Sequence, residues 1–198
     1  MTLWNLISYP LQLFLALSIA DFIAGVIHWL EDSYGSPDTP IVGKPIRANI
    51  LHHEDPRDFL KNNWWQNARS SLPLVLLFAG AFVLFDCLNF FTVSLLILGW
   101  NANEVHKWAH QSKRERPWIA TKLQNIGVFQ SPRHHYKHHR DDLDSDYCVM
   151  TPWVNPILNF IGFWRISVRI IFSVTGFKTR LDPYSKTPQH RLNPTTQP

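Results

Sequence analysis

The chain has 198 residues, a formal net charge of +4 and a hydrophobic fraction of 45%. Its length fits one domain with a sizeable core and is too short for two ordinary domains. No nucleic-acid recognition motif accompanies the positive charge, and the two cysteines, Cys87 and Cys148, form no pattern, so we exclude a nucleic-acid partner, a disulfide framework and a cysteine-based zinc site.

The first apolar block runs from about Leu11 to Leu30, long enough for a helix to span a hydrocarbon core of about 30 Å. It contains Asp21, and a carboxylate at membrane depth is functional by default because it is expensive to bury. Asp21 precedes His28 by seven residues, about 10 Å along a helix axis. This distance favours a role in a substrate cavity or in helix packing. No cleavable signal peptide is indicated, since the opening residues lack a basic segment.

The second apolar block, Leu72 to Trp100, is too long for one comfortable span and contains a polar break at residues 86–89. Either one tilted helix or a hairpin of two short helices would fit it. We favour the hairpin, because histidine clusters lie before and after the block. A hairpin returns the chain to the side on which it entered, whereas a single span would separate the clusters by the membrane.

The basic residues support the same topology independently. Every Lys and Arg lies either between Lys44 and Arg69 or from Lys107 onward. Under the positive-inside rule, the N-terminus and the hairpin tip then face outward and all histidine clusters face the cytoplasm. The chain is therefore expected to be an integral membrane protein, of the inner membrane if it is bacterial.

Trp153 to Gly176 is apolar but carries Arg165 and Arg169, four residues apart on one helical face, which favours an interfacial amphipathic helix over a span. The predicted fold class is all-α, an integral membrane protein with about three membrane helices. These are one span plus a hairpin, with cytoplasmic and interfacial helices carrying the histidines. Residues 1–177 form the predicted membrane domain, and residues 178–198 form a polar, Pro-rich and loosely ordered tail.

Nine of the ten histidines fall into four groups, and His190 alone is interpreted as a surface residue. Residues i and i+4 share a helix face, so His106 can converge on one ion with His110. The same spacing pairs His134 with His138 and His135 with His139, giving two adjacent rows of imidazoles. The candidate metal ligands are His28, His52, His53, His106, His110, His134, His135, His138 and His139.

This number of ligands favours two metal ions side by side. A zinc site uses about four ligands, and imidazole also suits iron, copper and nickel. Two near-octahedral ions with positions left open for oxygen would use all the clustered histidines. The alternative from another class is a non-catalytic membrane protein that binds zinc or iron as a sensor or adaptor.

Acidic residues near the histidines are candidates for hydrogen bonds to the metal-bound imidazoles. Asp32 follows His28 by four residues, Asp55 follows His53 by two, and Glu104 precedes His106 by two. An acidic tract follows the last cluster, where most members are expected to be solvated charges: Asp141, Asp142, Asp144 and Asp146.

Together these motifs resemble the plasmanylethanolamine desaturase family, also called Kua or CarF, whose relatives include a plastid phosphatidylglycerol palmitate desaturase. The resemblance covers about residues 18 to 170. It rests on Ala20-Asp21-Phe22, His28-Trp29, Pro40 to Lys44, His52-His53-Glu54-Asp55-Pro56, His106-Lys107-Trp108-Ala109-His110, the double-histidine cluster at 134–139, Tyr147-Cys148 and Ile161 to Arg165.

The resemblance implies an enzyme with two iron ions (Fe2+/Fe3+) that uses O2 and two electrons to desaturate a membrane phospholipid chain near its glycerol end. It makes Asp55 the candidate catalytic residue. The product is either the vinyl ether of a plasmalogen or a trans double bond in an acyl chain, and a hydroxylase would use the same site. Because no flavin, nucleotide or haem motif is present, electrons are expected from a ferredoxin or a cytochrome b5-like protein. A compact bacterial form is expected.

Overall fold

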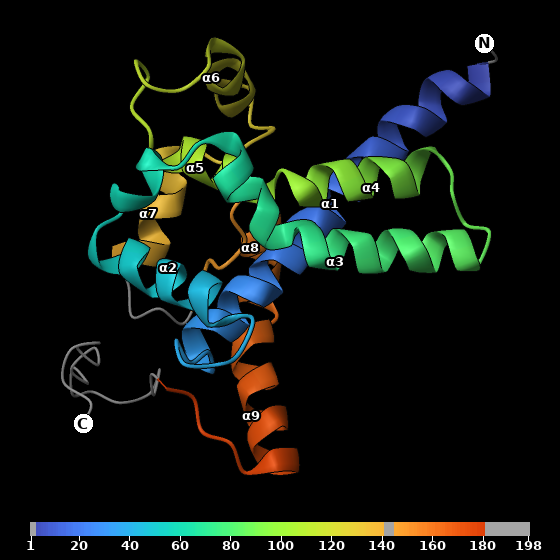
Figure 1. Ribbon diagram of the computed structural model, residues 1–198. Coiled ribbons are helices and arrows are strands. Elements are labelled where there is room, and N and C mark those ends of the chain that lie inside the picture. Colours follow the sequence, from blue (N-terminus) through green and yellow to red (C-terminus); the bar gives the residue numbers. More distant parts are fainter. Residues whose placement is uncertain (1–2, 141–144, 181–198) are drawn as a thin grey trace.

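The computed structural model describes residues 3–140 and 145–180, and all regular structure in these ranges is helical (Figure 1). The predicted all-α class is therefore confirmed. The helices are α1 (Leu3–Ser33), α2 (Gly43–Glu54), the short 3-10 helix η1 (Asp58–Lys61), α3 (Trp64–Leu84), α4 (Phe90–Trp100), α5 (Ala102–His110), α6 (Trp118–Asn125), α7 (Pro132–Arg140), α8 (Val154–Phe160) and α9 (Phe163–Thr175).

Two helices are long and apolar enough to cross a membrane, namely residues Ile7–Ser33 of α1 and the whole of α3. The shorter apolar helix α4 returns antiparallel to α3 after residues 85–89, so the predicted hairpin is confirmed (Figure 1). Large apolar side chains on this hairpin face outward, with Leu77 67% and Val83 64% exposed. Exposed apolar surface of this extent is what a lipid environment covers.

Both arms of the hairpin begin with a reciprocal cap. The Asn63 side chain accepts a hydrogen bond from the Gln66 backbone N–H, and the Gln66 side chain accepts from the Asn63 N–H. Asn89 and Thr92 repeat this arrangement at the start of α4. These caps satisfy amide groups that a helix end leaves without partners, so each arm starts at a defined residue.

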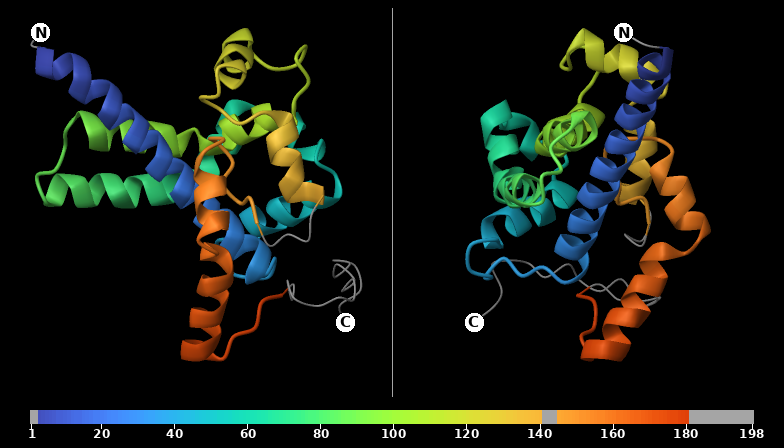
Figure 2. Two further views of the ribbon diagram at one scale, coloured as in Figure 1. Left: turned by 180° about the vertical axis from the view of Figure 1, so that it is seen from behind. Right: turned by 90° about the vertical axis from the view of Figure 1, so that its right-hand side faces the viewer.

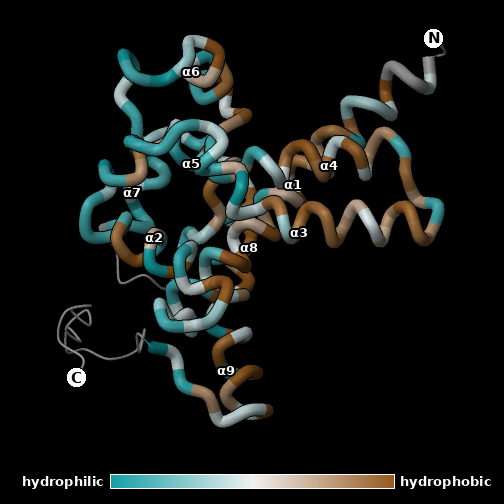
Figure 3. Tube along the Cα trace, in the orientation of Figure 1, coloured by the Kyte–Doolittle hydropathy of each residue, from teal (hydrophilic) through white to brown (hydrophobic). Residues whose placement is uncertain are grey.

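The region predicted as one interfacial helix forms two, α8 and α9, with a bend of 57° between them. Gly162 lies at the bend with φ 66°, a conformation that glycine adopts without strain. Figures 1 and 2 show α9 running across the direction of the α3–α4 hairpin. Figure 3 shows hydrophobic colour concentrated on the hairpin and hydrophilic colour on α5, α6 and α7. We call α5, α6 and α7 together the polar lobe, and it lies at one end of the membrane helices.

The core is built around α1, which packs against two clusters of buried side chains. One cluster joins α1 to α5 and to the chain before α8, through Leu17, Ala20, Ala102, Val105, Val149 and Met150. The other joins α1 to α8 and α9, through Trp29, Tyr147, Cys148, Val154, Leu158 and Trp164. α1 therefore links the membrane helices to the polar lobe, and near its C-terminal end His28 lies against His138 of α7.

Candidate metal centre

Four helices bring ligand-type side chains together at the C-terminal end of α1. Within the described residues, these side chains form two groups whose donor atoms lie within 4.8 Å of one another. The five-histidine group consists of His52, His106, His110, His135 and His139. The four-donor group consists of His28, Asp32, His53 and His138.

In the five-histidine group, the Nε2 atoms point at one another. His135 Nε2 lies 2.9 Å from His106 Nε2, 2.9 Å from His110 Nε2 and 3.1 Å from His139 Nε2. His106 and His110 Nε2 are 3.1 Å apart, and the buried His52 Nε2 has no hydrogen-bond partner among the described residues. One ring nitrogen holds a single N–H or a single lone pair, so hydrogen bonds cannot satisfy this arrangement. A shared cation can.

The spacing of these nitrogens also fits such an ion. With a metal–nitrogen distance of about 2.1 Å, neighbouring octahedral ligands lie about 3.0 Å apart and tetrahedral ones about 3.4 Å. The observed 2.9–3.1 Å separations match octahedral neighbours. Five histidines leave one octahedral position without a protein ligand.

The four-donor group is more widely spaced and includes a carboxylate. Asp32 Oδ2 lies 3.2 Å from His53 Nε2 and 3.4 Å from each of His28 Nε2 and His138 Nε2. The two nitrogens of His28 and His53 are also 3.4 Å apart. These separations approach those of a four-coordinate tetrahedral ion. The two groups therefore differ both in donor set and in geometry.

Backbone carbonyls orient several of the imidazoles through the other ring nitrogen. Nδ1 of His28 lies 3.2 Å from the Tyr147 carbonyl oxygen, and Nδ1 of His138 lies 2.9 Å from that of Ser145. His52 Nδ1 lies 2.5 Å from the Asn49 carbonyl oxygen. An N–H donated from Nδ1 leaves the lone pair on Nε2, which faces the donor group, as metal-bound histidines require.

The candidate ligands on α2, α5 and α7 are kept neutral by burial and by the neighbouring imidazoles. Burial, followed by repulsion from nearby histidines, lowers the pKa of His52, His106 and His135 well below the usual value. The same causes lower the pKa of His110 to about 4. At pH 7 these rings are unprotonated, which is the form that binds a metal ion.

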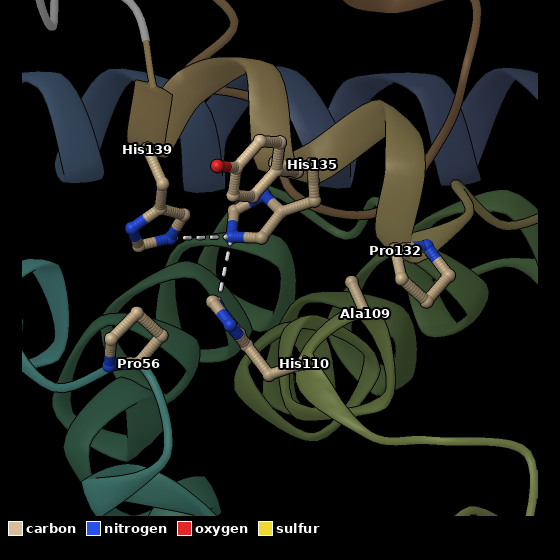
Figure 4. A pocket seen from close by; sticks show the side chains of 7 residues that line it. Pro56, Ala109, His110, Pro132, His135 and His139 are labelled. Atoms are coloured by element: carbon tan, nitrogen blue, oxygen red, sulfur yellow. Dashed lines mark hydrogen bonds between the residues drawn. The ribbon is translucent and has the colours of Figure 1, made fainter.

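A pocket of about 200 Å³ opens onto the five-histidine group. Figure 4 shows that His110, His135 and His139 point toward one another beside Pro56 and Pro132, which line the same pocket. Tyr136, 62% exposed, also lines it. The pocket reaches His110, which is the last residue of α5 and lies at the end of that helix away from α4. It therefore opens the five-histidine group toward the polar lobe.

Three predicted site residues lie outside both groups. His134 Nε2 is 3.9 Å from an Asp146 carboxylate oxygen, and burial lowers its pKa. Asp55 is exposed and accepts a hydrogen bond from the Arg57 N–H, so no contact in the described part of the chain supports its catalytic role, which stays a prediction. Glu104 accepts a hydrogen bond from Asn67 rather than from a histidine.

Two residues have larger roles than sequence reasoning assigned. Asp32 was considered only as a hydrogen-bond partner, yet its Oδ2 faces three imidazoles directly. Asn49 was missed altogether; its side-chain amide donates to Asp32 Oδ1 at 2.7 Å, and its carbonyl accepts from His52. The available signal was helical spacing, because Asn49 precedes His52 by three residues on α2.

Comparison with known proteins identifies the family. The lipid desaturase domain matches residues 17–182. A protein of Acanthamoeba polyphaga mimivirus, named a probable fatty acid desaturase, is 36% identical over 92% of each chain. Plasmanylethanolamine desaturase 1 of Mus musculus is 36% identical over 83% of this chain and 65% of its own length. Plasmanylethanolamine desaturase of Myxococcus xanthus is 31% identical over 90% and 65%, respectively.

This chain thus spans about two thirds of the mouse and bacterial relatives but most of the viral one. No solved structure matches it. Fatty acid desaturase 4 of Arabidopsis thaliana plastids is 31% identical over 82% of the chain, so the predicted resemblance to both branches is confirmed. The chain belongs to the lipid desaturase family and is an oxidoreductase of the desaturase kind.

Proposed function

We propose that this protein is an O2-dependent di-iron desaturase that introduces a double bond near the glycerol end of a membrane lipid chain. The observation that carries the proposal is the convergence of eight histidines and Asp32 into two adjacent donor groups. Desaturation is an oxidation, and zinc has no redox chemistry, so iron suits these groups better. Two irons bound there would supply, with O2 and two electrons, the oxidation of an unactivated C–H bond.

The protein's own residues hold the donors in place. Burial keeps His106 and His135 neutral, the carbonyls of Ser145 and Tyr147 orient two further imidazoles, and the packed helices limit access of water. The donor groups stand where α1 leaves its apolar stretch. This position favours oxidation of lipid carbons close to the headgroup over carbons at the bilayer centre.

The proposed substrate is an alkyl ether phospholipid, and the product is its vinyl ether. Two relatives carry the name plasmanylethanolamine desaturase, at 36% and 31% identity. The alternative is trans desaturation of an acyl chain, favoured by the plastid relatives named fatty acid desaturases at 30–31% identity. The distribution of Lys and Arg supports a cytoplasmic position for the metal centre.

An acidic one-electron carrier of the ferredoxin or cytochrome b5 type is the proposed electron donor. The ligand histidines of α7 face inward, whereas Arg133 and Lys137 of the same helix are exposed. These two cations are four residues apart and therefore share one outer face, close to the pocket lined by Tyr136. A negatively charged partner would be attracted to this surface and approach the five-histidine group from there.

The test is lipid analysis of an aerobically grown host that lacks plasmalogens but contains 1-O-alkyl lipids, with and without this gene. Acid-labile vinyl ethers are expected only with the gene. A His106→Ala variant, expressed at the same level, is expected to give none. A new trans acyl double bond would show that the substrate is the acyl lipid and not the ether lipid. If neither product forms while the protein is metal-loaded and reduced, the proposal is wrong.

A further inference from the structure

The carboxylate of Asp21, deep in α1, is the anchor for a distant part of the chain. Asp21 is fully buried. Its Oδ1 accepts a hydrogen bond from the Met150 N–H at 2.7 Å. Its Oδ2 accepts from the Thr151 N–H at 2.8 Å and from the Thr151 hydroxyl at 2.6 Å. Three donors from one short segment thus converge on one carboxylate, which compensates the charge for its removal from water.

We call residues 145–151, which lead toward α8, the docking segment. One turn beyond Asp21, Gly25 lets this segment lie directly on α1, because a Cβ at Gly25 would be 2.5 Å from Cys148 Sγ. Asn155 holds Cys148 in place through two hydrogen bonds. Its side chain accepts from the Cys148 N–H at 2.9 Å and donates to the Cys148 carbonyl at 2.8 Å. The backbone of the docking segment therefore has little freedom to shift along α1.

The fixed segment ends at the metal centre. Its Ser145 and Tyr147 carbonyls are the ones that face Nδ1 of His138 and His28, two of the three histidines in the four-donor group. Asp21, Gly25 and His28 are spaced four and three residues apart, so they occupy one face of α1. The same face thus carries the anchor, the close contact and a candidate ligand.

We propose that Asp21 is a positioning residue for the four-donor group: by anchoring the docking segment, it sets the carbonyls that orient His28 and His138. This inference rests on the metal centre described under the proposed function, but not on the lipid that the centre oxidises. The two carbonyl contacts of the docking segment go to His28 and His138, which both belong to the four-donor group, so the five-histidine group serves as an internal reference. Loss of a group that hydrogen-bonds a metal ligand typically weakens metal binding about 10- to 100-fold, and Asp21, which positions two such groups, is expected to have an effect in this range.

The experiment compares Asp21→Asn and Thr151→Val with the parent chain, each purified in detergent and freed of metal. An amide at position 21 turns an N–H toward the docking segment, and valine removes the hydroxyl donor while keeping the shape of threonine. Thr151→Ser keeps that hydroxyl and is the matched control. Cobalt(II) titration distinguishes the two groups, because four-coordinate cobalt absorbs visible light much more strongly than six-coordinate cobalt.

The expected result is that the intense four-coordinate cobalt signal needs about 10- to 100-fold more metal in Asp21→Asn, with a smaller loss in Thr151→Val and none in Thr151→Ser. The weaker signal of the five-histidine group is expected to be unchanged. If both signals weaken equally, or neither changes, the inference is wrong. If Asp21→Asn does not fold, Thr151→Val decides. A parent chain that binds two ions but makes no lipid product would contradict the proposed function and leave this test intact.

Discussion

His134 and His138 lie one helical turn apart on α7, yet the structure gives them different roles. His138 Nε2 is buried 3.4 Å from Asp32 Oδ2 within the four-donor group. His134 lies outside both groups, near Asp146. The two substitutions His138→Ala and His134→Ala therefore remove the same chemical group from the same helix, and only the first is expected to remove a ligand.

The magnitude follows from the number of donors. Four-ligand structural zinc sites bind with about 10–16 kcal/mol, so one ligand of four contributes roughly 2.5–4 kcal/mol. Each 1.4 kcal/mol is a factor of ten, which gives about 100- to 1000-fold weaker binding of one ion in His138→Ala. For His134→Ala, metal binding is expected to stay near that of the parent chain, because His134 Nε2 lies 3.9 Å from Asp146 and belongs to neither donor group.

The assay is competition between the metal-free protein and a chromophoric chelator, combined with lipid product formation. His138→Ala is expected to retain one tightly bound ion of two and to form no product. If His134→Ala loses metal to the same extent, the division of the histidines into these two groups is wrong.

Three further outcomes are expected. First, the metal-free protein should lose stability as the pH falls from 6.5 toward 4. The buried histidines stay neutral in the folded protein but take up a proton in the unfolded chain, so each lowers the free energy of unfolding by about 1.4 kcal/mol per pH unit in this window. A melting temperature that does not change between pH 6.5 and 4 would contradict this expectation. Second, Arg180→Gln should lower the melting temperature, because the Arg180 guanidinium donates hydrogen bonds to the Gly35 and Asp32 carbonyls at the end of α1. These contacts are worth about 1–2 kcal/mol. Lys178→Gln, at an exposed position, is the control and should leave the melting temperature unchanged. Third, Asn89→Ala should cost about 1 kcal/mol by removing the cap of α4, measurable as faster proteolysis at the hairpin tip; unchanged cleavage would show that the cap contributes nothing.

The hairpin was predictable because local features determined it. Its polar break between two apolar runs is visible in the sequence, as are the basic residues that lie on both sides of it and are absent within it, and residues 85–89 indeed connect α3 to α4. The convergence of four histidine-bearing segments was predictable for a similar reason. Clustered imidazoles have few other uses in one short membrane chain.

The division of ligands between two groups was not predictable in this way. On a helix, the four histidines at 134–139 cover an arc of about 140°, with His134 and His139 at its edges. Which edge faces the ions depends on the rotation of α7 about its axis, and this is set by packing against distant segments. The direct approach of Asp32 to three imidazoles depends likewise on α2 and α7, which local spacing does not place.

The anchoring of Asp21 by Thr151 has a consequence for biosynthesis. The two residues are 130 positions apart, and at about 5–20 residues per second the ribosome makes Thr151 roughly 7–26 s after Asp21. During that time α1 holds a carboxylate inside the membrane without the partners that later compensate it. Translation therefore imposes an order: α1 inserts first, the docking segment joins it later, and the ions can enter only a nearly finished chain.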